Sequence, residues 1–508
     1  MNKKPNVIFI LADDMGYGDV SALNENAGFQ TPNFDRLCEE GVAFTDAHAT
    51  SAVCSPSRYG LLTGRYNWRS RLKKGVLGGC DRALIAPERL TIGKMFQEMG
   101  YKTAAIGKWH VGMDFANVGD EILEHDMADY GIRDLDYSAK IENGPTTRGF
   151  DYFFGLAASL DTAPYLFIEN DHFTSLPDHY SEEVGVSFWV GKDKDKFDPR
   201  HSKIFWREGP VGADFDHEQV MPVLTKKVID KIEEYKEDPF FIYFPMTAVH
   251  TPILPTKEFR GKSGTNLYGD FVLMCDDVVK QVTDKLKELG LYDNTIVVFA
   301  SDNGCSSCAD YEELALFGHN PSYVFRGNKH DIYEGGHRIP FIIRWPEVIP
   351  AGGRCNSLVC LSDFFATMAE ILGYDLPDNA AEDSFSMLSL LLNADAPAVR
   401  TELIHQSMDG SLSIRKGKYK LEMCPGSGGE TYPYTGCETS DLPEYQLYDL
   451  DRDISEKNNI IENEKEIAES LKCDLTKIIH DGRSTKGQAQ KNEGEEFWAA
   501  IEWTKDYI

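Results

Sequence analysis

Four short apolar runs, each followed directly by polar side chains, form the clearest pattern in this chain. They span residues 6–11, 103–106, 240–244 and 295–300, and they are rich in β-branched and aromatic residues. Continuous apolar runs of this length predict strands that are buried on both faces.

Amphipathic stretches with a helical period lie between these runs, at 33–40, 91–99, 220–235 and 271–289. Alternation of strands and helices predicts an α/β fold, with a mostly parallel central sheet sandwiched by helices. Ligands of such sheets bind beyond the carboxyl ends of the strands. The polar residues that follow the four runs are therefore expected to converge on one rim.

The pattern changes in the last quarter of the chain. A fifth apolar run at 340–345 precedes a helix at 362–372 that Gly373 ends, and after about residue 378 the sequence becomes polar and rich in loops. We expect a large α/β domain over 1–378 and a smaller C-terminal α+β subdomain over 379–508. The subdomain is predicted to hold an antiparallel sheet plus one helix, with strands at 401–405, 412–415, 418–423 and 445–449 and the helix at 464–479.

One long segment, residues 114–207, is weakly periodic and contains many aromatic residues. Insertions of this kind often form the walls of substrate pockets. We expect this role here.

Composition and charge narrow the choice of partners. The chain has 508 residues, 42% of them hydrophobic, and a formal net charge of −30. The hydrophobic share indicates a folded globular protein. The negative charge argues against nucleic acid or an anionic membrane as a partner, and solubility is its simplest explanation.

No apolar run approaches the roughly 18 residues of a membrane span. The N-terminal run is too short for a signal peptide and is ended by Asp13 and Asp14. As written, the sequence predicts a cytoplasmic protein, or a periplasmic or secreted one whose signal was removed. The 11 cysteines are scattered, and the isolated pair Cys305 and Cys308 is expected to be two free thiols, with a redox or metal role as the alternative.

The stretch 51–65, Ser-Ala-Val-Cys-Ser-Pro-Ser-Arg-Tyr-Gly-Leu-Leu-Thr-Gly-Arg, carries the strongest candidate chemistry. The two serines that flank Pro56 are typical of helix starts, so Cys54 is expected at or just before a helix N-terminus. The helix dipole and Arg58 would then acidify the thiol and make it reactive. A buried structural cysteine is the alternative, and the spacing Cys-x-Pro-x-Arg argues against it.

Hard oxygen donors follow two of the apolar runs, as Asp13-Asp14 and as Asp302-Asn303. Such donors suit Ca²⁺ or Mg²⁺ and disfavour zinc. An adjacent polar pair alone is more often a capped turn, but two pairs at parallel strand ends indicate one metal site. Further cationic or proton-transferring groups follow the same pattern: Lys108, His110, His250 and Lys329.

The stretch around Cys54 closely resembles the signature of the type I sulfatases, which have an alkaline phosphatase-like fold. Gly-Lys-Trp-His at 107–110, Val-His-Thr-Pro at 249–252 and the Glu-Gly-Gly segment at 327–340 are similar to that family's motifs and occur in its order. In that family the cysteine is oxidised by a maturation enzyme to formylglycine, whose hydrate attacks sulfur.

The resemblance implies a formylglycine at Cys54 held by Arg58. It also implies one divalent cation, usually calcium with magnesium as the alternative, bound by Asp13, Asp14, Asp302, Asn303 and the modified Cys54.

The same resemblance implies a role for each remaining group. Asp302 helps to deprotonate the hydrate, His250 or Lys329 protonates the departing alcohol, and His110 takes the second proton when the sulfated hydrate collapses to the aldehyde. Lys108 adds positive charge beside the sulfonyl oxygens, which stabilises the transition state. Two alternatives stay open: a formylglycine-dependent phosphonate or phosphodiester hydrolase, and a catalytically silent glycan-binding homologue.

Residues 143–155 and 161–171 look similar to bacterial sulfatases of the N-acetylgalactosamine-6-sulfatase type. This implies an exo-acting enzyme that removes a 6-O-sulfate from galactose or N-acetylgalactosamine in a small sulfated sugar or oligosaccharide. Polar side chains that bond sugar hydroxyls and one aromatic ring are the candidate substrate contacts. They are Asp161, His172, His337, Arg338 and Tyr165, each with an ordinary loop residue as the alternative.

Overall fold

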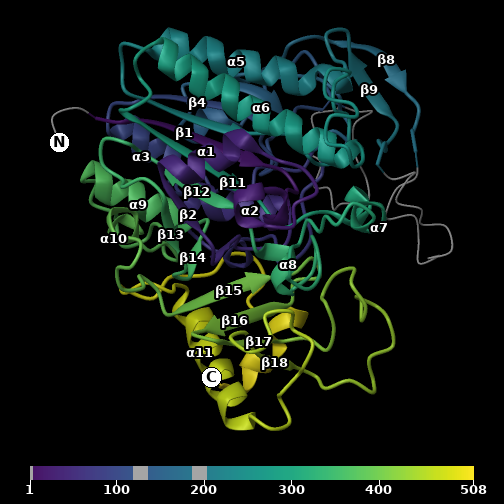
Figure 1. Ribbon diagram of the computed structural model, residues 1–508, viewed down its shortest axis with the longest axis vertical. Coiled ribbons are helices and arrows are strands. Elements are labelled where there is room, and N and C mark those ends of the chain that lie inside the picture. The colour runs from purple at the N-terminus through teal and green to yellow at the C-terminus, as the bar shows by residue number, and fades with distance from the viewer. Residues whose placement is uncertain (1–3, 118–134, 186–202, 508) are drawn as a thin grey trace.

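Figure 1 shows a computed structural model in which a large layered α/β part lies above a smaller sheet near the C-terminus. The structure describes residues 4–117, 135–185 and 203–507. Within these ranges the central sheet has ten strands in the order β13-β2-β12-β11-β1-β10-β4-β5-β6-β7. The four predicted runs form its centre as β1 (Asn6–Ala12), β4 (Lys102–Lys108), β10 (Phe240–Pro245) and β11 (Thr295–Ser301).

The central strands are parallel and buried on both faces, as the apolar runs predicted. In β1, Ile10 lies beside Phe244 of β10 and Phe299 of β11. Alternate residues of this strand enter different cores, because side chains alternate between the two faces of a sheet. Ile10 belongs to one core and Phe9 to the other.

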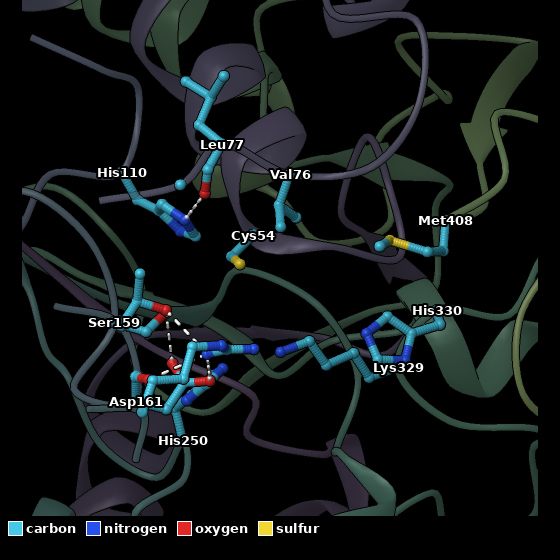
Figure 2. Close-up of a pocket in the computed structure, with 13 residues that line it drawn as sticks. Cys54, Val76, Leu77, His110, Ser159, Asp161, His250, Lys329, His330 and Met408 are labelled. Atoms are coloured by element: carbon cyan, nitrogen blue, oxygen red, sulfur yellow. Dashed lines mark hydrogen bonds and ion pairs between the residues drawn. The ribbon is translucent and has the colours of Figure 1, made fainter. Parts of the chain in front are cut away.

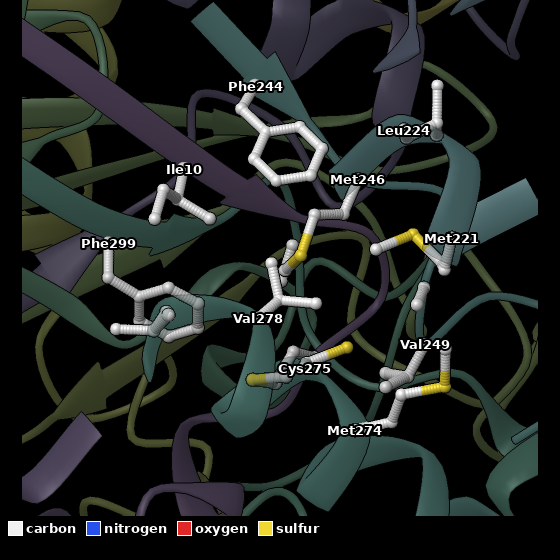
Figure 3. Packing of buried hydrophobic residues seen from close by; sticks show 14 of the residues in the cluster. Ile10, Met221, Leu224, Phe244, Met246, Val249, Met274, Cys275, Val278 and Phe299 are labelled. Atoms are coloured by element: carbon white, nitrogen blue, oxygen red, sulfur yellow. The ribbon is translucent and has the colours of Figure 1, made fainter. Parts of the chain in front are cut away.

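Helices cover both faces of the sheet. The first core receives α1 (Pro32–Glu40), α5 (Val220–Tyr235) and α6 (Leu267–Glu288). Figure 3 shows side chains of α5 and α6, such as Met221 and Val278, in the same packed cluster as Ile10. The second core receives α2 (Cys54–Thr63), α3 (Ile92–Glu98), α9 (Asp363–Leu372) and α10 (Leu388–Leu392).

The margins of the sheet are mixed. β12 (Phe341–Arg344) runs antiparallel to both β11 and β2 (Val42–Phe44), whereas β5 (Tyr152–Leu156) continues the parallel order beside β4. Apolar periodicity predicted neither β2 nor β5, since each is short and lacks a long apolar run. The outermost strands are β13 (Gly353–Cys355), β6 (Ile168–Glu169) and β7 (His172–Phe173).

The predicted C-terminal sheet is present as four antiparallel strands, with α11 (Lys465–Asp481) packed on it. The strands are β15 (Glu402–Gln406), β16 (Leu412–Lys416), β17 (Tyr419–Glu422) and β18 (Gln446–Asp449). The core of this part also contains Tyr66 and Trp68 from the larger part. The division of the chain near residue 378 stays a prediction.

Shorter elements complete the fold. The remaining strands and helices are β3 (Ala47–His48), β14 (Val359–Cys360), β8 (Pro177–Ser181), β9 (Gly209–Gly212), α7 (Tyr311–Ala315) and α8 (Glu334–His337). Short 3-10 turns lie at Tyr17–Asp19, Ser21–Leu23, Asn67–Arg69, Pro145–Thr147, His217–Gln219, Ser307–Ala309 and Ala499–Tyr507. Within the described ranges, no helix has the length and apolar character that crossing a bilayer requires.

Candidate active site

The polar residues after the central strands meet at one rim, as predicted. The backbone N–H of Asp302, after β11, donates to the Ala12 carbonyl at the end of β1 over 3.1 Å. The backbone N–H of Asp14 in turn donates to Asp302 Oδ1 over 3.2 Å. Asp13, Asp14 and Asp302 are all buried, so three carboxylates share a water-poor site at the carboxyl edge of the sheet.

Cys54 is the first residue of α2, in agreement with the sequence prediction, but the serines act differently from helix caps. The N-cap position is Val53, and it makes no side-chain cap hydrogen bond. The Ser55 hydroxyl instead accepts from the Leu77 backbone N–H over 3.1 Å. The Ser57 hydroxyl donates to a loop carbonyl over 2.9 Å. Both serines therefore fix the loops that surround Cys54.

The predicted acidification of the Cys54 thiol is wrong. Burial raises the pKa of this thiol above its usual value, and the nearby Lys108 and Lys329 offset that effect only in part. The expectation rested on the helix end and Arg58 and omitted the cost of ionising a buried group.

Three positively charged side chains, which we refer to as cations, lie against the three carboxylates. Arg58 donates from Nε and Nη2 to Asp302 Oδ2 over 2.9 and 2.8 Å. Lys108 Nζ lies 2.7 Å from Asp13 Oδ2, and Lys329 Nζ lies 2.7 Å from Asp14 Oδ2. We call Asp13, Asp14, Asp302 and Asn303 with these three cations the acidic cluster.

The carboxylates of the acidic cluster titrate differently. Burial acts to raise the pKa of Asp13, but Lys108, His250 and Arg58 hold it far below its usual range. Burial and the neighbouring Asp13 raise the pKa of Asp302 to about 7, against the effect of Arg58. Two close carboxylates cannot both ionise cheaply without a further cation.

The acidic cluster fits a hard divalent cation. Asp13 Oδ1 and Asn303 Oδ1 are buried and have no hydrogen-bond partner, although such atoms are normally satisfied. Asn303 Nδ2 donates to Asp14 Oδ1 over 2.8 Å, which leaves its carbonyl oxygen as the ligand atom. Single ligand atoms from Asp13, Cys54 and Asp302 all lie within 4.8 Å of one another. Carboxylate and amide oxygens are the donors that Ca²⁺ and Mg²⁺ prefer.

A cavity of about 320 Å³ opens onto Cys54 (Figure 2). His110 and His250 lie on different sides of it. The Nε2 atom of His110 is 2.8 Å from the Leu77 carbonyl, and its Nδ1 is buried without a partner. The Nδ1 atom of His250 is 2.6 Å from the Thr251 carbonyl, and its Nε2 is 3.7 Å from Asp14 Oδ2. If the atoms bonded to carbonyls carry the protons, His110 Nδ1 and His250 Nε2 are the atoms left to exchange protons.

Of the five predicted substrate contacts, only Asp161 lines this cavity among the described residues. Tyr165 is 1% exposed, and its hydroxyl donates to the Arg207 carbonyl while its ring packs against His217. It is therefore a packing residue and not a platform for a sugar ring. His172 is exposed at the sheet margin beside Asp171.

The other two predicted contacts, His337 and Arg338, belong to a second buried group. His48 Nδ1 lies 2.9 Å from His337 Nδ1, and the rings of His337 and His405 stack with centroids 3.7 Å apart. Arg338 is paired with Glu334 over 2.6 Å. We call His48, His337 and His405 the histidine cluster. Both residues were predicted from residue type alone, and this packing keeps them from the cavity.

Several cavity residues were missed by the sequence reasoning. Ser159, Thr162 and Arg207 come from the long insertion, whose described parts supply pocket walls as predicted. Residues 118–134 and 186–202 of that insertion lie outside the described ranges. The other missed residues are Val76, Leu77, Gly78, His330 and Met408. No motif marks them, although His330 directly follows the predicted Lys329.

A loop of the C-terminal sheet supports the Cys54 loop from behind. The Gln406 carbonyl accepts the Ala52 backbone N–H over 2.8 Å and the Ser51 hydroxyl over 2.9 Å. Met408, two residues further, bonds through its backbone N–H to the His330 carbonyl over 2.9 Å and lines the cavity. The smaller sheet therefore takes part in the site.

Comparison with known proteins agrees with this geometry. The family profile described as Sulfatase matches residues 5–374, and one described as N-sulphoglucosamine sulphohydrolase, C-terminal, matches residues 326–481. The chain is 35% identical to an N-acetylgalactosamine-6-O-sulfatase of Bacteroides thetaiotaomicron, covering 92% of each chain. It is 25% identical to the human N-acetylgalactosamine-6-sulfatase, over 98% of this chain and 89% of that protein.

A solved structure from work on the metabolism of multiple glycosaminoglycans by Bacteroides thetaiotaomicron is also similar, with a TM-score of 0.79 and 33% identity. The match covers 94% of this chain and 99% of that one. The fold is thus the alkaline phosphatase-like fold of the sulfatases, whose members generally use a formylglycine and a divalent metal. The chain is a member of the sulfatase family and an enzyme that hydrolyses sulfuric esters.

Proposed function

We propose that this sulfatase is exo-acting and removes a 6-O-sulfate from a terminal galactose or N-acetylgalactosamine residue of a sulfated glycan. The small cavity around Cys54 is the observation that carries the proposal. Its volume of about 320 Å³ lies near the lower end of the roughly 300–1,000 Å³ of ligand sites. It suits one sugar residue better than an internal segment of a polysaccharide. The N-acetylgalactosamine-6-sulfatases among the relatives support the choice of sugar.

The metal is proposed to be calcium, held by Asp13, Asp14, Asp302, Asn303 and the modified Cys54. When bound, such a cation draws the sulfate oxygens and the nucleophile together and acts as a Lewis acid. Formylglycine at Cys54 requires a maturation enzyme in the host, so that enzyme is proposed as a partner of the newly made chain.

The chain's own residues supply the remaining chemistry. Lys108 and Lys329, each 2.7 Å from a carboxylate of the acidic cluster, place positive charge where the sulfonyl oxygens would lie. Arg58 holds Asp302 by two hydrogen bonds, which orients that carboxylate as the base for the nucleophile.

Two histidines handle the other protons. We assign the proton for the departing alcohol to His250 and not to Lys329, because the Lys329 ammonium is held by Asp14 over 2.7 Å. His250 lines the cavity and acts as the imidazolium, with Nε2 3.7 Å from the Asp14 carboxylate that favours this charged form. His110, with its unpartnered Nδ1, is placed to take the second proton.

The first experiment is mass analysis of the peptide that contains Cys54, followed by turnover of a panel of monosulfated sugars. Galactose, N-acetylgalactosamine and N-acetylglucosamine, each sulfated at position 6, are compared with 3- and 4-sulfated galacto-sugars. We expect conversion of Cys54 and a preference for the 6-sulfated galacto-sugars. Preference for a 3- or 4-sulfate, or for the gluco ring, would reject the substrate proposal and leave the sulfatase activity standing.

Two other candidates are separated by simple assays. Faster turnover of an aryl phosphonate than of an aryl sulfate would favour a phosphonate or phosphodiester hydrolase. Binding of the sugars without turnover, by a protein with converted Cys54, would favour a silent glycan-binding protein.

A further inference from the structure

The cavity beside Cys54 has two chemically different walls. One wall is apolar and comes from Val76, Leu77 and Met408, while polar residues of the insertion lie across from it (Figure 2). The described lining residues include no phenylalanine, tyrosine or tryptophan, so none of these rings is there for a sugar to stack on. Orientation of the ring must then come from the polar wall, because hydrogen bonds are directional.

The polar wall is organised by an ion pair between Asp161 and Arg207. Arg207 Nη1 donates to Asp161 Oδ2 over 2.8 Å, to the Asp161 carbonyl over 2.9 Å and to Thr162 Oγ1 over 3.2 Å. The guanidinium also lies 5.2 Å from the ring centroid of Phe205. These contacts hold the pair in place before any substrate arrives.

The side chains of Asp161 and Arg207 are only partly accessible to solvent. The Asp161 side chain is 14% exposed and that of Arg207 is 21% exposed, and both line the cavity. Most of the pair is thus shielded from bulk water. Hydrogen bonds to charged groups are stronger than those between neutral groups, and the low dielectric of the protein strengthens them further.

Asp161 of this pair lies beside His250, the proposed acid for the leaving group. Asp161 and His250 lie next to each other in Figure 2, on one side of Cys54. If His250 protonates the departing oxygen, Asp161 lies beside the part of the sugar that carries that oxygen. In a 6-sulfated sugar this oxygen is O6, and the ring hydroxyl nearest to it along the carbon chain is O4. O4 is also the position at which galacto and gluco sugars differ.

We propose that Asp161 and Arg207 bind the O4 hydroxyl and its O3 neighbour, and that this contact selects the galacto ring. The inference rests on the proposed function and extends it by naming the specificity-determining pair. An ionised carboxylate accepts a hydrogen bond from one hydroxyl, while a guanidinium donates to the next, so the two together suit a vicinal diol. An equatorial O4 would miss this pair and would lose the hydrogen bond that the axial hydroxyl forms.

The test compares Arg207→Met and Asp161→Asn with the wild-type enzyme on three substrates. These are a 6-O-sulfo-galactoside, its gluco epimer and 4-nitrophenyl sulfate, which has no ring hydroxyls. We expect each variant to lose about 10- to 100-fold in kcat/KM on the galactoside, the scale of one charge-assisted hydrogen bond. The galacto-to-gluco ratio should fall towards one, while turnover of 4-nitrophenyl sulfate stays nearly unchanged.

Controls separate selection from folding. Arg260→Met removes an exposed arginine paired with Glu218 outside the cavity and should change no ratio. Arg207→Lys keeps the charge without the planar fork and should recover only part of the galacto preference. An unchanged galacto-to-gluco ratio in Arg207→Met, or an equal loss on 4-nitrophenyl sulfate, would overturn the inference. If the wild type cleaves 4-nitrophenyl sulfate but no 6-sulfated sugar, the proposed substrate has failed before any variant is tested.

Discussion

The acidic cluster and the histidine cluster are both buried groups that look suitable for a metal ion, yet their surroundings differ. In the acidic cluster, Asp13 Oδ1 and Asn303 Oδ1 have no hydrogen-bond partner. The Asp13 ligand atom lies within 4.8 Å of that of Cys54, which lines the open cavity. In the histidine cluster, Lys420 Nζ lies 3.1 Å from His337 Nε2 and Arg415 Nη1 lies 3.3 Å from His48 Nε2. Fixed positive charges thus face two of the imidazoles that would have to bind a cation.

The histidines also differ in how they are packed. The rings of His337 and His405 are stacked at 9° to each other, although one ligand atom from each of the three histidines lies within 4.8 Å of the others. Burial lowers the pKa of all three histidines, which favours their neutral form. His405 Nε2 is also buried without a hydrogen-bond partner, so an unsatisfied atom alone does not mark a functional site. The two clusters differ in access, because Lys329 of the acidic cluster lines the cavity and none of the three histidines does.

The largest expected effect concerns the nucleophile of the acidic site. Cys54→Ser should lose more than about 10⁴-fold in turnover, the scale on which removal of a catalytic nucleophile acts, because serine cannot provide the second hydroxyl of an aldehyde hydrate. The thermal midpoint should hardly change, since the two side chains are nearly the same size. Full multiple turnover by this variant would disprove the hydrate mechanism.

The second expected effect tests the contrast between the acidic cluster and the histidine cluster through the metal content of the purified protein. Asp302→Ala should remove both the bound divalent cation and most activity, because it deletes a proposed ligand and the carboxylate that accepts two hydrogen bonds from Arg58. His405→Gln should leave the metal content at its wild-type value. Elemental analysis of both purified proteins checks this, and a metal loss in His405→Gln alone would reverse the assignment of the two clusters.

The third expected effect is a loss of rate that depends on the leaving group of the substrate. His250→Ala should slow hydrolysis of a sugar sulfate by about 10²- to 10⁴-fold, the usual contribution of a general acid. Nitrophenyl sulfate should suffer much less, because nitrophenolate departs without a proton. Steady-state rates on both substrates decide the point, and equal losses would remove His250 from this role.

The smallest effect is on stability and belongs to the histidine cluster. Burial, with a further contribution from Arg338, lowers the pKa of His48 to about 4, against the effects of Glu334 and Asp46. The unfolded chain, with a pKa of about 6.5, therefore binds the proton more tightly than the folded protein does, so stability falls as the pH drops from about 6.5 to 4. The total for His48 is on the order of 3 kcal/mol.

The measurement is urea unfolding at pH 7.5 and at pH 5 for wild type and His48→Gln. The variant should show a smaller difference in unfolding free energy between the two pH values. His179→Gln, at an exposed position, should behave as wild type. A variant as sensitive to acid as the wild type would exclude His48 as a source of the pH dependence.

Sequence reasoning was most successful where local pattern determines structure. The four central strands, α5 and the C-terminal sheet lie where apolar periodicity predicted them, and the polar residues at strand ends meet as parallel topology requires. The reasoning failed at Tyr165, His337 and Arg338 because residue type does not reveal packing. It missed Arg207 and Met408 because long-range folding alone brings them to Cys54.

The carbonyl of Gln406 that supports the Cys54 loop has a practical consequence for engineering. A truncated enzyme ending near residue 378 would lose this carbonyl together with Met408, and it would bare the apolar rings of Tyr66 and Trp68. Shortening the chain to a minimal enzyme, or exchanging its C-terminal part with that of a relative, therefore disturbs the nucleophile itself. Any chimera must therefore take the β15–β16 junction and the Cys54 loop from the same parent protein.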